Sequence, residues 1–136
     1  MPTSPLPDEL RTLLAKPNPA VMASLRRDGA PVSVATWYLL DGERFLVNLD
    51  EGRKRLDHLR HDPRVTLTVL DGEDWYTHVS VQGRVTELRD DVGLVDIDRI
   101  ARHYTGKEYR NRERGRVSAY IEVDRWHGWG NARKAG

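Results

Sequence analysis

The sequence predicts a mainly β protein, a six-stranded antiparallel barrel with peripheral helices. Short runs rich in β-branched and aromatic residues recur along the 136-residue chain. Three Asp-Gly dipeptides, at 28–29, 41–42 and 71–72, separate such runs. Asp-Gly is typical of tight hairpin turns in which both central residues have positive φ. Antiparallel strands that must hide their edges favour a closed or nearly closed barrel.

The strands are predicted from these runs in chain order. They span residues 20–27, 31–40, 44–49, 64–70, 75–88 and 116–123. The fifth is the longest, and Gly83 inside it indicates a β-bulge or a sharp bend, because glycine weakens a regular strand.

Three helices are predicted around the strands, at residues 7–16, 52–63 and 90–106. The first begins at Pro7 and has leucines at helical spacing. The second is short, places Leu56 and Leu59 on one face, and stops at Pro63. The third starts with aspartates, which suit the helix dipole, and ends at Gly106 as a C-cap.

Composition indicates one globular domain over residues 1–136, with 38% hydrophobic and 32% charged residues. No apolar run approaches the ~20 residues of a membrane helix, and the N-terminus has no secretory pattern. Cysteine is absent, which excludes disulfides and fits a cytoplasmic setting.

The 22 basic residues nearly balance 21 acidic ones, so we expect no nucleic-acid partner. The five histidines are scattered, and we expect no metal site.

A run of cations after a glycine is the strongest candidate binding feature. Gly52 precedes Arg53, Lys54 and Arg55 at the start of the second predicted helix. Cations are unfavourable at a helix N-terminus unless an anion is bound there, and arginine grips phosphate with two hydrogen bonds. We therefore predict a phosphate site. The alternative is a solvated face that nearby acids neutralise, namely Asp50, Glu51 and Asp57.

Four stretches of the sequence, two of which overlap, resemble a known family. The run RFLVNLDEGRKRLDHLRHDPRVTL and the strand SVQGRVTEL resemble the flavin-binding segments of the pyridoxamine 5′-phosphate oxidase-like split barrels. The opening AVMASLRRDGAPVSVATWYL and the segment GEDWYTHVSVQGRV are similar to the branch described as probable F420 (deazaflavin)-dependent enzymes. The resemblance extends from about Leu10 to about Trp129.

The resemblance implies an obligate homodimer of split barrels with F420, or alternatively FMN, bound in grooves at the dimer interface. Its phosphate would lie on Arg53, Lys54 and Arg55. Its ring would lie along two strands, near Ser33, Ala35, Thr36, Trp37, Asn48, Leu49 and Asp50, with backbone groups of the last three reading its polar edge. Two aromatic residues would come from the partner subunit, Trp75 and Trp129.

The implied function is an F420-dependent reductase that transfers a hydride to a small organic substrate. The oxidases proper carry an Arg-x-Val-Leu-Leu-Lys strand and a C-terminal Arg-Leu-His-x-Arg pattern. Neither is present here, so we do not expect pyridoxamine phosphate oxidation. An FMN-dependent oxidoreductase and a cofactor-storage protein without turnover remain open. The sequence selects no catalytic residue, and Tyr76, Tyr104 and His127 are equivalent candidates for a proton donor.

The polar segment from Tyr104 to Arg116 looks mobile and carries a basic excess. That excess favours a polyanionic ligand nearby, although a solvated loop is an equally good interpretation.

Overall fold

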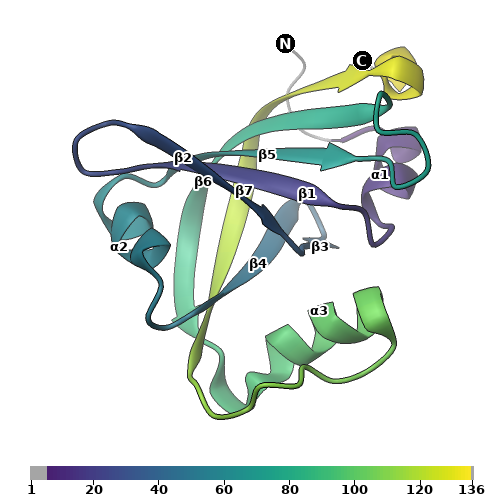
Figure 1. Ribbon diagram of the computed structural model, residues 1–136. Helices are drawn as coiled ribbons and strands as arrows, with labels where there is room; N and C mark the ends of the chain where they lie inside the picture. The colour runs from purple at the N-terminus through teal and green to yellow at the C-terminus, as the bar shows by residue number, and fades with distance from the viewer. Residues whose placement is uncertain (1–5, 136) are drawn as a thin grey trace.

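Seven antiparallel strands form one curled sheet in the order β2-β1-β5-β6-β7-β4-β3. The computed structural model describes residues 6–135, with side chains as far as residue 132. The sheet wraps around the core, and the helices lie at its ends (Figure 1). The strands are β1 (Ala20–Leu25), β2 (Pro31–Thr36), β3 (Leu39–Asp41), β4 (Arg44–Asp50), β5 (Arg64–Leu70), β6 (His78–Asp90) and β7 (Arg116–Trp129).

The predicted count of six strands is wrong, because the predicted strand at 31–40 is two strands. It breaks at Trp37 and Tyr38, and its halves β2 and β3 form the opposite edges of the sheet. The buried Tyr38 hydroxyl donates to the carbonyl oxygen of Leu14 at 2.8 Å. The Tyr38 N–H donates to the Tyr104 hydroxyl at 3.3 Å instead of to a strand. The barrel is therefore split where β2 passes into β3.

All three predicted Asp-Gly hairpins exist, but their turn type differs from the prediction. Gly29 and Gly42 have positive φ, +87° and +63°. Among residues 6–135, Leu94 is the one non-glycine residue with positive φ, so the aspartates do not share this conformation. The carboxylates of Asp28 and Asp71 accept the backbone N–H groups two residues on, from Ala30 at 3.0 Å and from Glu73 at 2.9 Å. In these two turns, hydrogen bonds to the aspartate side chain take the place of the predicted left-handed backbone at the aspartate.

The bend at Gly83 is confirmed. The pairing of β6 with β7 shifts register between Gln82 and Gly83. A Cβ atom at Gly83 would overlap the carbonyl oxygen of Glu122 on β7, so the two backbones approach more closely than any other residue allows. β7 also continues to Trp129, six residues past its predicted end at 123.

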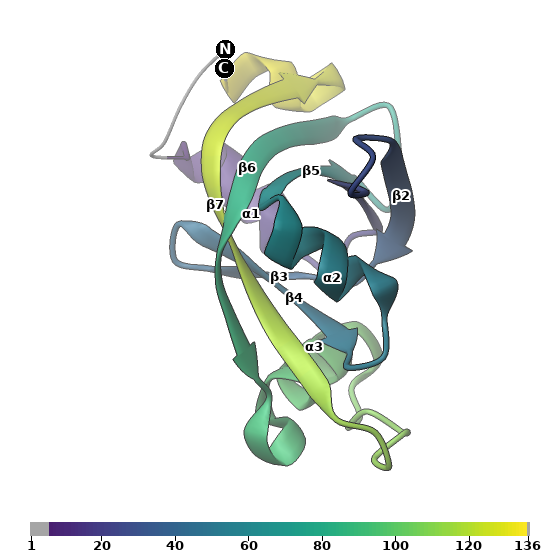
Figure 2. The ribbon, with the colours of Figure 1, turned by 90° about the vertical axis from the view of Figure 1, so that its left-hand side faces the viewer.

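The helices close the core of the barrel. α1 (Asp8–Leu14) and α2 (Lys54–His61) bury their leucines against the inner face of the sheet, as predicted. Figure 2 shows α2 lying across the opening of the barrel and α3 (Val95–Thr105) below it. A 3-10 turn (η1, Val92–Leu94) precedes α3, and Gly106 ends it with a φ of +78°. A second 3-10 turn (η2, Gly130–Ala135) ends the described chain.

α3 packs against its own small apolar cluster, made by Leu46, Ile97, Ile100 and Tyr120. No helix within residues 6–135 has both the length and the apolar character needed to span a bilayer.

Candidate functional site

A pocket of about 600 Å³ lies at the split in the barrel. It is bounded by the end of β2, the middle of β4, the start of α2, the inner face of α3 and the start of β7. Its size falls within the range of small-molecule and cofactor sites. A closed small barrel is filled by its own side chains and has no room for a ligand inside. The split opens a concave site beside this filled core.

One end of the pocket is cationic. Arg55 from α2 and Arg116 from β7 line it, together with Asn48 from β4, and no carboxylate among the described residues lines the pocket. Burial lowers the pKa of Arg55, and the positive charges of Arg53 and Arg116 lower it further. The guanidinium stays charged, but holding that charge here is unfavourable. An anionic ligand would remove this repulsion.

Two of the three acids near the cation run pair with other arginines. Asp50 pairs with Arg114 at 2.7 Å, and Asp57 pairs with Arg27 at 3.4 Å. Arg53, Lys54 and Arg55 form no ion pair with any residue between 6 and 135. Asp50, Glu51 and Asp57 therefore form no direct ion pair with the three cations, and the alternative of a solvated face that nearby acids neutralise stays open.

The segment between α3 and β7 is fastened at several points. Glu51 N–H donates to the carbonyl oxygen of Gly115 at 3.0 Å, and Arg114 grips Asp50. Arg112 binds Asp98 of α3 with two hydrogen bonds, at 2.9 and 3.1 Å. Two of the arginines in the predicted basic excess, Arg112 and Arg114, thus form ion pairs within the protein. The fastened segment holds Tyr109 and Arg116 against the pocket.

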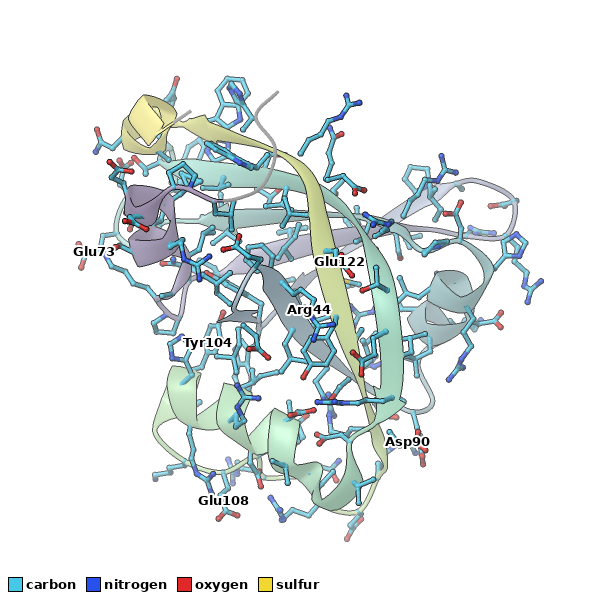
Figure 3. All side chains as sticks on the ribbon, turned by 180° about the vertical axis from the view of Figure 1, so that it is seen from behind. Arg44, Glu73, Asp90, Tyr104, Glu108 and Glu122 are labelled. Carbon is cyan, nitrogen blue, oxygen red and sulfur yellow. The ribbon has the colours of Figure 1, made fainter. Side chains whose placement is uncertain are left out.

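Aromatic side chains line the pocket next to the arginines. Trp37 stacks on Tyr104 with ring centroids 5.1 Å apart, and Tyr109 meets Trp37 edge-on at 6.4 Å. Tyr104 lies between α3 and the strands (Figure 3). Pro17, Pro19, Ile97 and Ile100 add apolar surface. Flat rings, apolar side chains and arginines in one pocket suit a ligand with a planar apolar part and an anionic part.

Tyr104 does not qualify as the proton donor. Its hydroxyl donates to the carbonyl oxygen of Asn18 at 2.6 Å and accepts from Tyr38 N–H. Burial raises the pKa of Tyr104 to about 12. The Tyr104 hydroxyl therefore links the backbone of Asn18, before β1, to the backbone of Tyr38, between β2 and β3. Tyr76 and His127 do not line the pocket.

The structure brings together five of the predicted site residues as pocket lining: Ala35, Thr36, Trp37, Asn48 and Arg55. The side chain of Leu49 is buried in the core, which leaves only its backbone for the predicted contact. The remaining predicted residues lie outside the lining: Ser33, Asp50, Arg53, Lys54, Trp75 and Trp129. Trp75 and Trp129 are 72% and 44% exposed. The roles predicted for all twelve residues stay predictions.

Sequence reasoning missed several residues of the site. Tyr109, Ile97 and Ile100 were not selected, and Arg116 was noted only as one member of a basic segment. The signal for Arg116 is the pairing of β4 with β7, which places it opposite Asp50. That pairing joins residues far apart in the chain and could not be predicted from local pattern.

Asp98 accepts hydrogen bonds from Arg112 and from the Tyr109 N–H, and we expect its contribution to stability to depend on pH. Hydrogen bonds from Arg112, and then from the Tyr109 N–H, lower the pKa of Asp98. Because the folded-state pKa lies below the unfolded value of about 3.9, the stabilisation is complete above that pH and is lost as the pH falls through the folded value. We expect Asp98→Asn to lower the free energy of unfolding at pH 7. Urea titrations should show the difference from the wild type shrinking below about pH 4. A difference that did not change with pH would contradict this role.

Comparison with solved structures supports the fold. An F420 reductase is 24% identical over 85% of this chain and 94% of its own, with a TM-score of 0.77. A conserved hypothetical protein from Mycobacterium tuberculosis is 21% identical over 98% of this chain and 88% of its own, with a TM-score of 0.70.

General stress protein 26 from Bacillus anthracis is 16% identical over 90% of this chain and 92% of its own, with a TM-score of 0.70. At these identities the likeness concerns the fold. A search of curated protein sequences finds no match. The family model described as pyridoxamine 5′-phosphate oxidase matches residues 6–130, and the chain therefore belongs to this family of split barrels.

Proposed function

We propose that the protein is an oxidoreductase that binds F420 in the pocket at the split and reduces a small organic substrate. The observation that carries the proposal is the cationic end of the pocket, where Arg55 and Arg116 lie without a carboxylate partner. The F420 reductase with the same fold supports deazaflavin over flavin.

The residues present fit such a cofactor. Arg55 and Arg116 would hold its anionic part, with the exposed Arg53 and Lys54 adding charge at the mouth. Trp37 and the apolar side chains of α3 would cover its ring and exclude water. When bound, a reduced deazaflavin supplies a hydride to an organic acceptor. The protein itself would then bind the cofactor, orient its ring and exclude water from the pocket.

The proposal includes a homodimer. The face of the sheet turned away from the core has two rows of small uncharged side chains across its centre. Paired neighbours in these rows include Ser33 with Ala23, Ala23 with Thr66, and Thr68 with Ser80. The edge strand β2 is mostly exposed as well. Small uncharged side chains on a sheet face beside an open edge suit a second copy of the chain. Trp75 and Trp129 would then reach the partner's pocket.

Fluorescence titration of the purified protein with F420, and separately with FMN, at matched ionic strength tests the proposal. We expect micromolar or tighter binding of F420 and weaker binding of FMN. A preference for FMN would favour the second candidate, an FMN-dependent oxidoreductase, which the family assignment also supports. Binding of neither would refute a cofactor role for the pocket. Binding without turnover of any acceptor would favour a storage protein.

Light scattering tests the dimer. We expect the wild type to have twice the mass of the chain and Thr66→Glu to be monomeric, because this change places like charges in the centre of the proposed interface. Thr86→Glu is the control, since Thr86 is an exposed threonine on the same sheet outside the two rows. A monomeric wild type that still bound F420 tightly would exclude a shared site.

A further inference from the structure

A chain of hydrogen bonds runs from the pocket into the protein behind it. Arg116 Nε donates to Asn48 Oδ1 at 2.6 Å, and its terminal nitrogen donates to the Asn48 carbonyl oxygen at 3.4 Å. On the other side of the amide, Asn48 Nδ2 donates to Asp91 Oδ2 at 3.1 Å and to Ser118 Oγ at 3.2 Å. The pocket arginine is thus connected through one amide group to a buried carboxylate and a buried hydroxyl.

The direction of each bond in this chain is determined. Both hydrogens of the Asn48 amide are used by Asp91 and Ser118, so its oxygen must face Arg116. The Ser118 hydroxyl donates to Asp96 Oδ2 at 2.6 Å, which leaves its oxygen free to accept from Asn48. Ser118 is 0% exposed, and Asp91 and Asp96 are each 6% exposed. Exchanging donor and acceptor in any of these hydrogen bonds would leave a buried polar group without its partner, which is costly.

Asp91 fixes the far end of the chain to α3. Its two oxygens accept the backbone N–H groups of Asp96 and Ile97, each at 2.9 Å. These are N–H groups of the first helical turn, which lack partners inside the helix. Asp91 therefore serves the start of α3 and the amide of Asn48 at the same time. The same helix supplies Ile97 and Ile100 to the pocket.

Two neutral residues, Asn48 and Tyr109, hold Arg116 by hydrogen bonds. Besides Asn48, it donates to the Tyr109 hydroxyl at 3.3 Å, and its guanidinium lies 4.6 Å from the centre of that ring. It forms no ion pair with any residue between 6 and 135. A guanidinium has five N–H donors, and the described residues accept three of them. Two remain for a ligand.

We propose that Asp91 and Ser118 are positioning residues that act through Asn48 to hold Arg116 in its anion-binding orientation. Asp91 is buried and does not line the pocket, yet it sets the direction of the amide that Arg116 rests on. The proposal deepens the proposed function, but it requires only that the pocket takes an anionic oxygen. It extends the site to residues that no ligand would touch.

A double-mutant cycle tests this coupling, because residues that act in one chain are not additive. The variants are Arg116→Gln, Asp91→Asn, Ser118→Ala, and Arg116→Gln combined with each of the other two. The probes are F420, FMN and inorganic pyrophosphate, titrated by calorimetry at one ionic strength. We expect Arg116→Gln to weaken binding by about 10- to 100-fold. We expect Asp91→Asn and Ser118→Ala to weaken it by at least about 5-fold and to add nothing when Arg116 is already replaced.

A control separates positioning from loss of stability. Thr77 is a buried threonine outside the pocket whose hydroxyl donates to Asp74 at 2.9 Å. Thr77→Val should lower the melting temperature as Ser118→Ala does but leave affinity unchanged. Ser118→Ala keeps the test available if Asp91→Asn does not fold.

The outcomes are distinct. Full additivity in the double variants, or no effect of the single ones, would overturn the positioning role while leaving F420 binding by the wild type intact. Coupled losses measured with pyrophosphate alone would support the positioning role and reject the cofactor. If the wild type binds none of the three probes, both proposals fail.

Discussion

Replacing Arg55 by alanine lowers the affinity for a phosphate-bearing cofactor by about 10- to 100-fold, from charge-assisted bonds of roughly 1.5–3 kcal/mol. The melting temperature of the unliganded protein stays constant or rises, because the change removes a half-buried charge that two other arginines repel. The loss of affinity without a loss of stability follows from one fact. Arg55 has no acidic partner within residues 6–135. Fluorescence titration and calorimetry on the same preparations measure both effects.

Arg60 provides the matched control. It is exposed on the same helix, forms no ion pair with the described residues and does not line the pocket. Arg60→Ala should leave affinity and stability nearly unchanged. Arg53→Ala should have a smaller effect than Arg55→Ala, because Arg53 is exposed outside the pocket. If unliganded stability fell sharply in Arg55→Ala while affinity held, the cation run would be structural.

Gly83→Ala should destabilise the protein by on the order of 3 kcal/mol, the largest effect we expect from a single methyl group. The added Cβ would overlap the backbone carbonyl of Glu122, and a backbone cannot rotate away as a side chain can. Relief requires β6 and β7 to separate at the register shift, in the centre of the sheet. Urea denaturation followed by tryptophan fluorescence measures the loss.

Gly72→Ala is the control for this change. Gly72 has no positive φ, and the nearest atoms to a Cβ there lie at 3.8 Å, an ordinary contact. Its replacement should change stability by less than about 1 kcal/mol. Equal losses in the two variants would mean that the close approach at Gly83 relaxes easily, and the bend would then not depend on glycine.

Local pattern was enough to predict the strands, the three hairpins and the bend at Gly83. It failed at Trp37 and Tyr38, where the composition still indicates a strand. The break depends on tertiary contacts: Tyr38 is buried and binds the backbone near the end of α1, and Tyr104 takes its N–H. A long-range hydrogen bond overrides β propensity at that point.

The candidate site was predictable only in part. Arg55 and Asn48 belong to a contiguous motif, so the resemblance selected them. Arg116 and Tyr109 enter the pocket because β7 pairs with β4 and because Asp98 fastens the preceding segment. Neither cause is visible in a local window of sequence. F420 specificity, the dimer, the single-domain extent and a cytoplasmic location stay predictions.

The split in the barrel has a consequence for folding. β2 and β3 are neighbours in the chain but lie at opposite edges of the sheet. The pocket takes residues from the edge strand β2 and from β4, the strand beside the other edge, so it is complete only when both sides of the sheet are in place. A partly folded form that lacks β2 lacks Ala35 and Thr36 of the site. A bound ligand therefore favours the form in which β2 has joined the sheet, and protection from proteolysis by a bound ligand would report closure of the sheet around its core.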